Sequence, residues 1–148
     1  MTPSRKKRGP IRIGKQPPQY NFFLNPYQDF RFTSCPKCDR KTGQRKLPLL
    51  IFVQQAYPVA LNYTCRYCAD CDLLIARRDE IEGHLTRLFA QLAPEVIGSD
   101  YLVIGTLDRA DWKRGMQKPL DFDEMEKALH DFKHVWNFEV TGGWVKDT

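Results

Sequence analysis

Five cysteines in a short chain constrain the fold more than any other feature of the sequence. They occur as Cys35-Pro-Lys-Cys38 and, after 29 intervening residues, as Cys68-Ala-Asp-Cys71, with Cys65 three residues before the second pair. Two C-x-x-C pairs joined by a hairpin-sized insert are typical of a structural zinc site, because each short loop directs two thiolates at one tetrahedral metal. An odd number of cysteines without a secretion signal argues against disulfides. We therefore predict one structural Zn²⁺ per chain.

Three cysteines compete for the two ligand positions of the second pair. The residue after the second cysteine of such a loop favours a left-handed or turn conformation, which Gly, Asn and Asp adopt most easily. Asp39 and Asp72 follow the first pair and the pair that ends at Cys71, whereas Ala69 follows the competing pair that ends at Cys68. Cys65 is then a packed thiol beside the site, or alternatively a ligand. The predicted metal ligands are Cys35, Cys38, Cys68 and Cys71.

The pattern of β-forming residues predicts several short strands. They cover residues 30–32, 47–54, 59–64, 73–76 and 101–104, and a further strand is predicted over 137–145. The second and third runs are bracketed around residues 55–58, which is the arrangement of a β-hairpin. The hairpin lies between the two cysteine pairs, so it positions both halves of the predicted zinc site.

Two amphipathic helices are also predicted. The first begins at Asp79, with Glu82 completing a capping box, and ends before Pro94, while the second begins at Asp121, with Glu124 in the same role. The apolar face is Ile81, Leu85, Leu88, Phe89 and Leu92 in the first helix, and Phe122, Met125, Leu129, Phe132 and Trp136 in the second. The predicted fold class is α+β: a small zinc-ribbon β-hairpin domain with two amphipathic helices and short extra strands.

Charge divides the chain in two. Residues 1–66 carry 13 Lys and Arg against two acids, whereas residues 67–148 carry 10 against 16. The first 20 residues hold six Lys and Arg, no acid and four prolines, a composition that buries too little apolar surface to fold. The predicted organisation is a disordered basic arm over 1–20, a zinc ribbon plus helix over 21–92, and a small α/β cap packed on the ribbon over 93–148.

The basic half indicates a polyanionic partner, because phosphates neutralised by Lys and Arg release counterions. The chain is therefore predicted to bind DNA or RNA, largely without sequence preference, through the arm and one face of the ribbon. The predicted phosphate contacts are Arg5, Lys6, Lys7, Arg8, Arg31, Lys37, Arg40, Lys41, Arg45 and Lys46.

The alternative is a protein–protein interaction module, antitoxin-like or an adaptor, that uses the acidic and aromatic C-terminal half. Trp112, Trp136 and Trp144 lie within 33 residues of one another, and tryptophan is a frequent anchor of protein interfaces. Trp136 is predicted to lie in the core, because it continues the second helix face. Trp144, flanked by glycines, is predicted to be the exposed anchor.

The cysteine motifs and their surroundings resemble a known family. The sequence reads Cys35-Pro36-Lys37-Cys38, then a basic run over 41–46, then Tyr67-Cys68-Ala69-Asp70-Cys71-Asp72 and an amphipathic helix. Over residues 35–92 this resembles the bacterial YgiT-type zinc finger of MqsA-like antitoxins. The resemblance implies a zinc ribbon. Those antitoxins continue into a helix-turn-helix, for which residues 93–148 show no recognition-helix pair.

Other residues give weaker signals. His130 and His134 are four apart and could hold a metal, although charged neighbours indicate a solvated helix face. Asp108 with Arg109 and Asp111 could form an acid–base group, but Asp108 is more simply a helix N-cap. No catalytic motif is found, and four thiolates leave a tetrahedral ion no open position, so the protein is predicted to be non-catalytic. No apolar run is long enough to cross a bilayer, which predicts a cytoplasmic protein.

Overall fold

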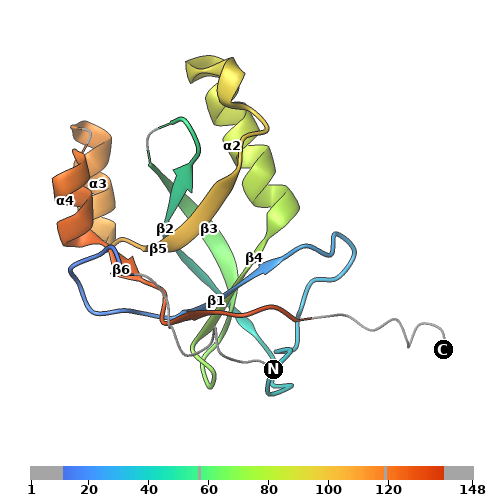
Figure 1. Ribbon diagram of the computed structural model, residues 1–148. Coiled ribbons are helices and arrows are strands. Elements are labelled where there is room, and N and C mark those ends of the chain that lie inside the picture. The colour runs from blue at the N-terminus through green and yellow to red at the C-terminus, as the bar shows by residue number, and fades with distance from the viewer. Residues whose placement is uncertain (1–11, 57, 119, 139–148) are drawn as a thin grey trace, which may run out of the picture.

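A computed structural model describes residues 12–56, 58–118 and 120–138 of the chain (Figure 1). The fold is α+β, as predicted, and it is built on one seven-stranded sheet. The elements are β1 (Asn21–Asn25), β2 (Gly43–Val53), β3 (Val59–Cys68), β4 (Leu73–Arg77), α2 (Arg78–Leu92), a 3₁₀ turn (Pro94–Val96), β5 (Tyr101–Thr106), α3 (Arg109–Gln117), α4 (Phe122–Ala128), β6 (His130–Asp131) and β7 (His134–Val135).

The predicted hairpin is confirmed as the antiparallel pair β2 and β3, which is longer than the sequence indicated. Residues alternate between the two faces of β2: Leu49 and Ile51 enter the largest buried cluster, whereas Leu50 enters a second cluster on the other side. This alternation is what a strand covered on both faces requires. The predicted strands at 73–76 and 101–104 are likewise confirmed, as β4 and β5.

The sheet curls so that its two edges are joined by one short segment. The strand order is β6-β5-β2-β3-β4-β1-β7, yet only residues 132 and 133 separate β6 from β7 along the chain. Residues 130–135 therefore pair first with β5 at one end of the curled sheet and then with β1 at the other end. Phe132 donates its backbone N–H to Ile104, and Trp136 donates its N–H to Phe22. Strand β5, from the predicted C-terminal cap, thus shares one sheet with the predicted ribbon rather than packing on it.

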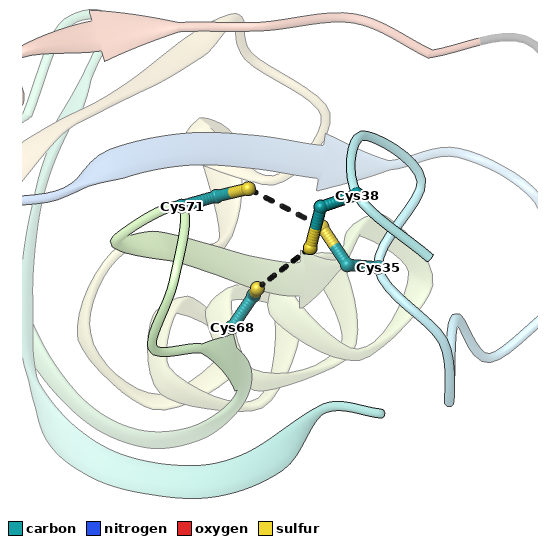
Figure 2. Close-up of side chains that lie close together, drawn as sticks. All are labelled: Cys35, Cys38, Cys68 and Cys71. Carbon is teal, nitrogen blue, oxygen red and sulfur yellow. Dashed lines mark hydrogen bonds between the residues drawn. The ribbon is translucent and has the colours of Figure 1, made fainter. Parts of the chain in front are cut away.

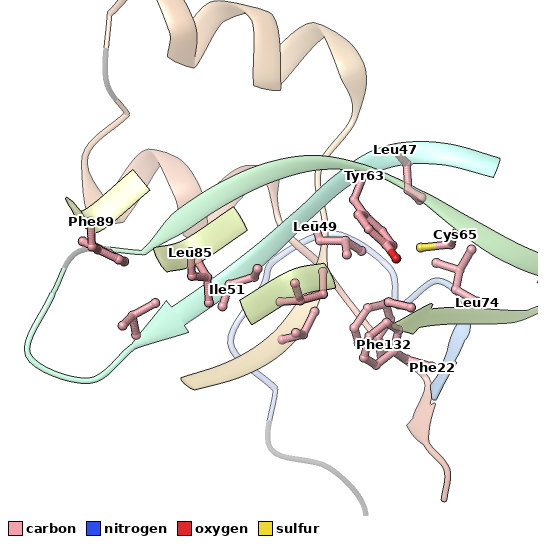
Figure 3. Packing of buried hydrophobic residues seen from close by; sticks show 14 of the residues in the cluster. Phe22, Leu47, Leu49, Ile51, Tyr63, Cys65, Leu74, Leu85, Phe89 and Phe132 are labelled. Atoms are coloured by element: carbon pink, nitrogen blue, oxygen red, sulfur yellow. The ribbon is translucent and has the colours of Figure 1, made fainter. Parts of the chain in front are cut away.

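Helix α2 covers the largest cluster, and α3 with α4 lie beside the hairpin (Figures 1 and 3). Ile81, Leu85 and Phe89 are the buried residues of α2, and they pack against Leu49 and Ile51. Of the predicted apolar face, Leu88 and Leu92 are exposed, so the buried stripe is narrower than the sequence indicated. No helix in the described part of the chain is long and apolar enough to cross a membrane.

The predicted strand over 30–32 is wrong. These residues form no regular element, and Phe32 adopts a positive φ of 54°. The N-terminal strand is instead β1, which pairs in parallel with β4. Phe22 and Phe23 of β1 point to opposite faces of the sheet and enter two different buried clusters, so this strand supplies aromatic packing to both.

The described part of the predicted basic arm, residues 12–20, lies against the fold instead of standing free. The buried carboxylate of Asp131 accepts backbone N–H groups from Ile13 at 3.0 Å and from Gly14 at 2.6 Å. His130 Nδ1 lies 2.8 Å from the carbonyl of Pro17. Segment 12–20 therefore belongs to the domain, and only residues 1–11 of the predicted arm fall outside the described residues.

The capping box predicted for the first helix is wrong. The N-cap residue of α2 is Arg77, and no side chain caps the helix. Asp79 instead accepts hydrogen bonds from the Arg77 guanidinium at 3.3 and 3.1 Å, and Glu82 accepts one from the hydroxyl of Tyr101 at 2.8 Å. The hydrogen bond from Arg77 lowers the pKa of Asp79.

This contact predicts a pH-dependent contribution to stability. A carboxyl with a lowered pKa in the folded state stabilises the protein above the unfolded pKa of about 3.9, and this contribution is lost as the pH falls through the folded pKa. We expect Asp79→Asn to unfold at lower denaturant concentration than the wild type at pH 7, and the two midpoints to converge as the pH falls below about 4. Asp100→Asn, an exposed acid without an ion pair among the described residues, is the control. A difference of constant size across this range would contradict the assignment.

The second predicted helix is correct at its start and wrong at its end. Asp121 and Glu124 form the predicted capping box, with both hydrogen bonds present. The helix stops at Ala128, however, and Phe132 and Trp136 lie in the extended segment that follows. Phe122, predicted to face the core, is 53% exposed.

Candidate metal centre

The structure brings four of the five cysteines together. The sulfur atoms of Cys35, Cys38, Cys68 and Cys71 all lie within 4.8 Å of one another. Figure 2 marks two of the sulfur pairs: Cys38 to Cys68 at 3.5 Å and Cys35 to Cys71 at 3.9 Å. Four sulfurs around a tetrahedral ion with 2.3 Å metal–sulfur bonds stand about 3.8 Å apart. The cluster therefore has the size that a tetrahedral thiolate site needs, and it could hold a metal ion.

Two short loops position these sulfurs, and each has a left-handed residue directly after its second cysteine. Asp39 and Asp72, which follow the second cysteine of each loop, have φ angles of 69° and 52°. This confirms the conformation predicted from the sequence, and aspartate adopts it at lower cost than a β-branched or bulky residue. The left-handed residue turns the chain back after the second cysteine, so that both sulfurs of each loop face the same point.

Backbone hydrogen bonds hold the first loop closed. Cys35 donates its N–H to the carbonyl of Arg40 at 2.8 Å and accepts the N–H of Asp39 at its own carbonyl, also at 2.8 Å. The N–H of Lys37 points at the Cys35 sulfur from 3.4 Å. The first loop thus keeps a fixed shape that brings the sulfurs of Cys35 and Cys38 into the same cluster.

The second loop is fixed to β1. Asn21 donates its side-chain amide to the carbonyl of Cys71 at 2.9 Å and its backbone N–H to the carbonyl of Asp72 at 2.7 Å. The Asp72 carboxylate accepts hydrogen bonds from Tyr67 and Lys133, both at 2.9 Å. Neither Asn21 nor Lys133 was predictable as a support of this loop, because each lies 50 or more positions away along the chain and no local pattern marks it.

Beneath the sulfurs lies a small apolar cluster. Cys35 and Cys68 are each only 1% exposed, and they pack with Phe23, Phe32 and Ile75. Cys38 and Cys71 are half-buried on the outer side. Two buried and two partly accessible sulfurs leave one side of the cluster near the surface, through which an ion can enter.

The shifted thiol pKa values indicate that the cluster needs a cation before all its sulfurs can be charged. Burial raises the pKa of Cys71 to about 12 and also raises that of Cys68, whereas the backbone N–H of Arg40 lowers the pKa of Cys38. Four thiolates at this spacing repel one another, so they cannot all be charged near neutral pH without a cation. A bound metal ion supplies that charge, and its binding releases protons.

Cys65 does not belong to the cluster. It is 1% exposed and packs with Tyr63 and Leu74 in the cluster beneath α2. Because β3 runs through residue 68, positions 65 and 68 are three apart on one strand and face opposite sides of the sheet. Burial raises the pKa of the Cys65 thiol, as expected of an inert packed cysteine.

The predicted nucleic-acid contacts within the described chain are all exposed, and most of them surround the cysteine cluster. Lys37 and Arg40 belong to the first loop, and the run 41–46 leads from it into β2, where Gly43 pairs with Tyr67 just before the second loop. We call the two cysteine loops with residues 41–46 the metal end; its loops lie at the bottom of Figure 1, away from the three helices, whereas Lys46 lies beside the first turns of α2. Arg5, Lys6, Lys7 and Arg8 fall outside the described residues.

Most of these cations have no acidic partner. Among the described residues, Arg31, Lys37, Lys41, Arg45 and Lys46 form no ion pair. Arg40 pairs with Asp70 at 3.1 Å, but both side chains are more than half exposed, so the pair contributes little to stability.

Aromatic rings accompany the basic side chains at the metal end. The Arg45 guanidinium lies 4.2 Å from the centre of the Tyr67 ring and donates a hydrogen bond to the Tyr20 hydroxyl at 3.0 Å. Lys37 lies 4.9 Å from the ring of Trp136. These contacts hold two cations in place on the surface without neutralising their charge.

The weaker sequence candidates do not form sites. His130 in β6 and His134 in β7 stand at opposite ends of the strand order, so they do not form a metal pair on a helix. His130 is buried rather than solvated, and its Nε2 lies 3.3 Å from Asp108. Asp108 occupies the predicted N-cap position of α3, although its side chain makes no cap hydrogen bond. In the described part of the chain, the four cysteines are the only group of three or more potential ligands gathered closely enough for a metal.

Two of the three tryptophans can be placed. Trp136 is half-buried against the apolar cluster beneath the cysteines, so it packs, although not as part of a helix. Trp112 lies on α3 and is half-buried. Trp144, the predicted anchor, lies outside the described residues, as does the predicted strand beyond residue 138.

Comparisons with protein-family models, with curated proteins and with solved structures gave no match for this chain. The resemblance to the YgiT-type zinc finger therefore stays a prediction. What the chain does must be argued from its own geometry.

Proposed function

We propose that the cysteine cluster holds one structural Zn²⁺ and that the metal end binds nucleic acid without catalysing a reaction. Zinc is favoured because four cysteine thiolates with tetrahedral spacing are its usual structural ligand set. The two loops and the hairpin between them then form a zinc ribbon. With all four coordination positions taken by protein sulfur, such an ion has no place for a substrate or water, which supports a structural role.

The observation that carries the nucleic-acid proposal is the set of unpaired cations at the metal end. Lys37, Lys41, Arg45 and Lys46 are exposed there and form no ion pair with the described residues. Unpaired cations on one surface repel one another, and a phosphate backbone relieves that repulsion while releasing its counterions.

Acids and cations are mixed at the other end of the molecule. Asp121, Asp123 and Glu124 lie at the start of α4, while Lys113 and Arg114 lie on α3. The preference of a polyanion for the metal end therefore rests on the unpaired cations there. Contacts of this kind fix orientation on the phosphate backbone and carry no sequence information, so binding with little sequence preference is expected.

Charge-reversal variants test this proposal against a matched control. We expect wild-type protein to bind labelled single-stranded and duplex DNA or RNA with an affinity that falls as salt rises, measured by fluorescence anisotropy. The double variant Lys41→Glu, Lys46→Glu should weaken binding and reduce the slope of log K against log salt by about 2. Lys113→Glu with Lys118→Glu changes net charge equally at exposed positions on and just after α3, and it should leave most of the binding intact.

Three results would contradict the proposal. They are absence of binding to every nucleic acid at low salt, an equal loss of binding in the control variant, and a salt slope that the Lys41 and Lys46 changes do not alter. A truncation that removes residues 1–11 measures the part played by Arg5, Lys6, Lys7 and Arg8. It must stop there, because residues 12–20 are hydrogen-bonded to the fold.

A further inference from the structure

An apolar groove lies between the β2–β3 hairpin and the helix pair α3 and α4. Its volume is about 680 Å³, which is within the range of binding pockets. Leu50 and Leu107, both nearly fully buried, belong to the groove and to the cluster beneath it. Trp112 and Met116 line it from α3, and Met125 lines it from α4. The groove is on a different part of the molecule from the cysteine cluster, with which it shares no residue.

The apolar surface continues outside the groove. Met116 is 68% exposed and Phe122 is 53% exposed, although both line the groove. Exposed large apolar residues that adjoin an apolar groove are a sign of an interaction surface rather than of isolated surface residues. A small molecule seated in the groove would leave these side chains in water, whereas a peptide segment can cover both.

Charge indicates the chemistry of that segment. The charged residues that line the groove are two carboxylates, Asp111 and Asp121. The cations of α3 lie off the groove: Arg109, Lys113 and Arg114 do not line it, although Arg114 reaches back to Asp111 at 2.9 Å. The two helices thus turn apolar and acidic side chains toward the groove, which complements an apolar segment carrying Lys or Arg and disfavours a nucleic acid.

We infer that this groove docks a basic amphipathic segment of a partner protein. Apolar side chains of the segment fill the space between the hairpin and the helices, with methionine side chains adapting to their shape. Lys or Arg beside them pairs with Asp121 and shares Asp111 with Arg114. The inference goes beyond nucleic-acid binding and uses a separate surface, so each can fail without the other.

Defined peptides test the inference with the full-length protein. The probe is a fluorescent Leu/Lys peptide of about 14 residues with its leucines on one helical face. A Leu/Glu peptide of the same pattern and a Leu/Lys peptide of the same composition in scrambled order are its controls. At about 0.15 M salt we expect the patterned Leu/Lys peptide to bind at least tenfold more tightly than either control in anisotropy titrations.

Variants at exposed positions locate the binding. Met116→Lys and Phe122→Lys should each weaken binding of the patterned basic peptide about tenfold, because each adds repulsion and removes apolar contact. Leu102→Lys, at another exposed apolar position, should not, and nucleic-acid binding should be unchanged in all three. Thermal unfolding midpoints close to that of the wild type are expected for all three variants and would establish that the fold persists. Failure of the patterned peptide to bind, equal binding of the scrambled or acidic peptide, or binding insensitive to both groove variants would overturn the inference.

Discussion

Replacing Cys71 with serine is expected to abolish stoichiometric metal binding and to destabilise the protein by more than about 4 kcal/mol. Purified wild-type protein should contain about one Zn²⁺ per chain, and the variant well under half of that. We expect a large effect because the metal would join the two loops, which are otherwise held by hydrogen bonds and limited apolar packing. Among the described residues, the cluster beneath the sulfurs contains six buried residues, and two of them are the proposed ligands Cys35 and Cys68.

The destabilisation expected for Cys71→Ser also has a contribution from the backbone conformation of the two loops. Asp39 and Asp72 hold left-handed conformations, which oppose folding by a modest amount at each position. The proposed metal would offset this cost, since it would link loops that are about thirty residues apart in the chain. Replacing Cys71 leaves Cys68 among the remaining sulfurs, and burial raises the pKa of the Cys68 thiol, which opposes its conversion to a thiolate ligand.

Cys65→Ala is the matched control for Cys71→Ser. It removes a buried sulfur from the cluster under α2, on the other face of the sheet, so metal content measured by mass spectrometry should be unchanged. Stability should fall by about 1 kcal/mol, the cost of a small cavity. If Cys71→Ser kept a full complement of metal, or if Cys65→Ala lost it, the ligand assignment would be wrong. A chelator added to wild-type protein should reproduce the Cys71→Ser unfolding curve.

The candidate site could be predicted from the sequence because its information is local. Each loop is a four-residue motif followed by an aspartate, and the requirement for a left-handed residue distinguishes Cys71 from Cys68 as the end of a pair. The exclusion of Cys65 could also have been read from the sequence, had β3 been extended through residue 68, because strand alternation sets positions 65 and 68 on opposite faces. Supporting contacts from Asn21 and Lys133 depend on the closed sheet and have no local signal.

The fold was predictable where sequence neighbours pair and unpredictable where distant segments meet. Antiparallel neighbours β2, β3 and β4 follow from local alternation and turns. Strand β1 was missed because its partners in the sheet are β4 and β7, far along the chain. The end of α4 was missed because apolar residues keep helical spacing past Ala128, while the open edges of β5 and β1 require an extended partner. Pairing of those edges outweighs the helical preference of the segment.

Phe132 reports on that closure. Its ring stacks on Phe22 with 4.5 Å between centres and 5° between planes, and the two residues are only 3% and 2% exposed. The neighbouring backbone joins both sheet edges, since Phe132 donates its N–H to Ile104 of β5 and Lys133 donates its N–H to Tyr20 just before β1. The side chain thus anchors the segment that links the two edges.

We therefore expect Phe132→Ala to lower the free energy of unfolding by about 3–5 kcal/mol. Val135→Ala in the same segment, at a 56% exposed position, should cost at most about 0.5 kcal/mol. Denaturant unfolding of both variants measures the difference, and a cycle with Phe22→Ala should give a coupling of about 0.5–1.5 kcal/mol for the stacked pair. Metal content should stay near one ion per chain in Phe132→Ala, because its ring lies in the cluster under α2 and not beneath the cysteines. Equal, small effects of Phe132→Ala and Val135→Ala would mean that residues 130–135 lie loosely on the surface and do not close the sheet.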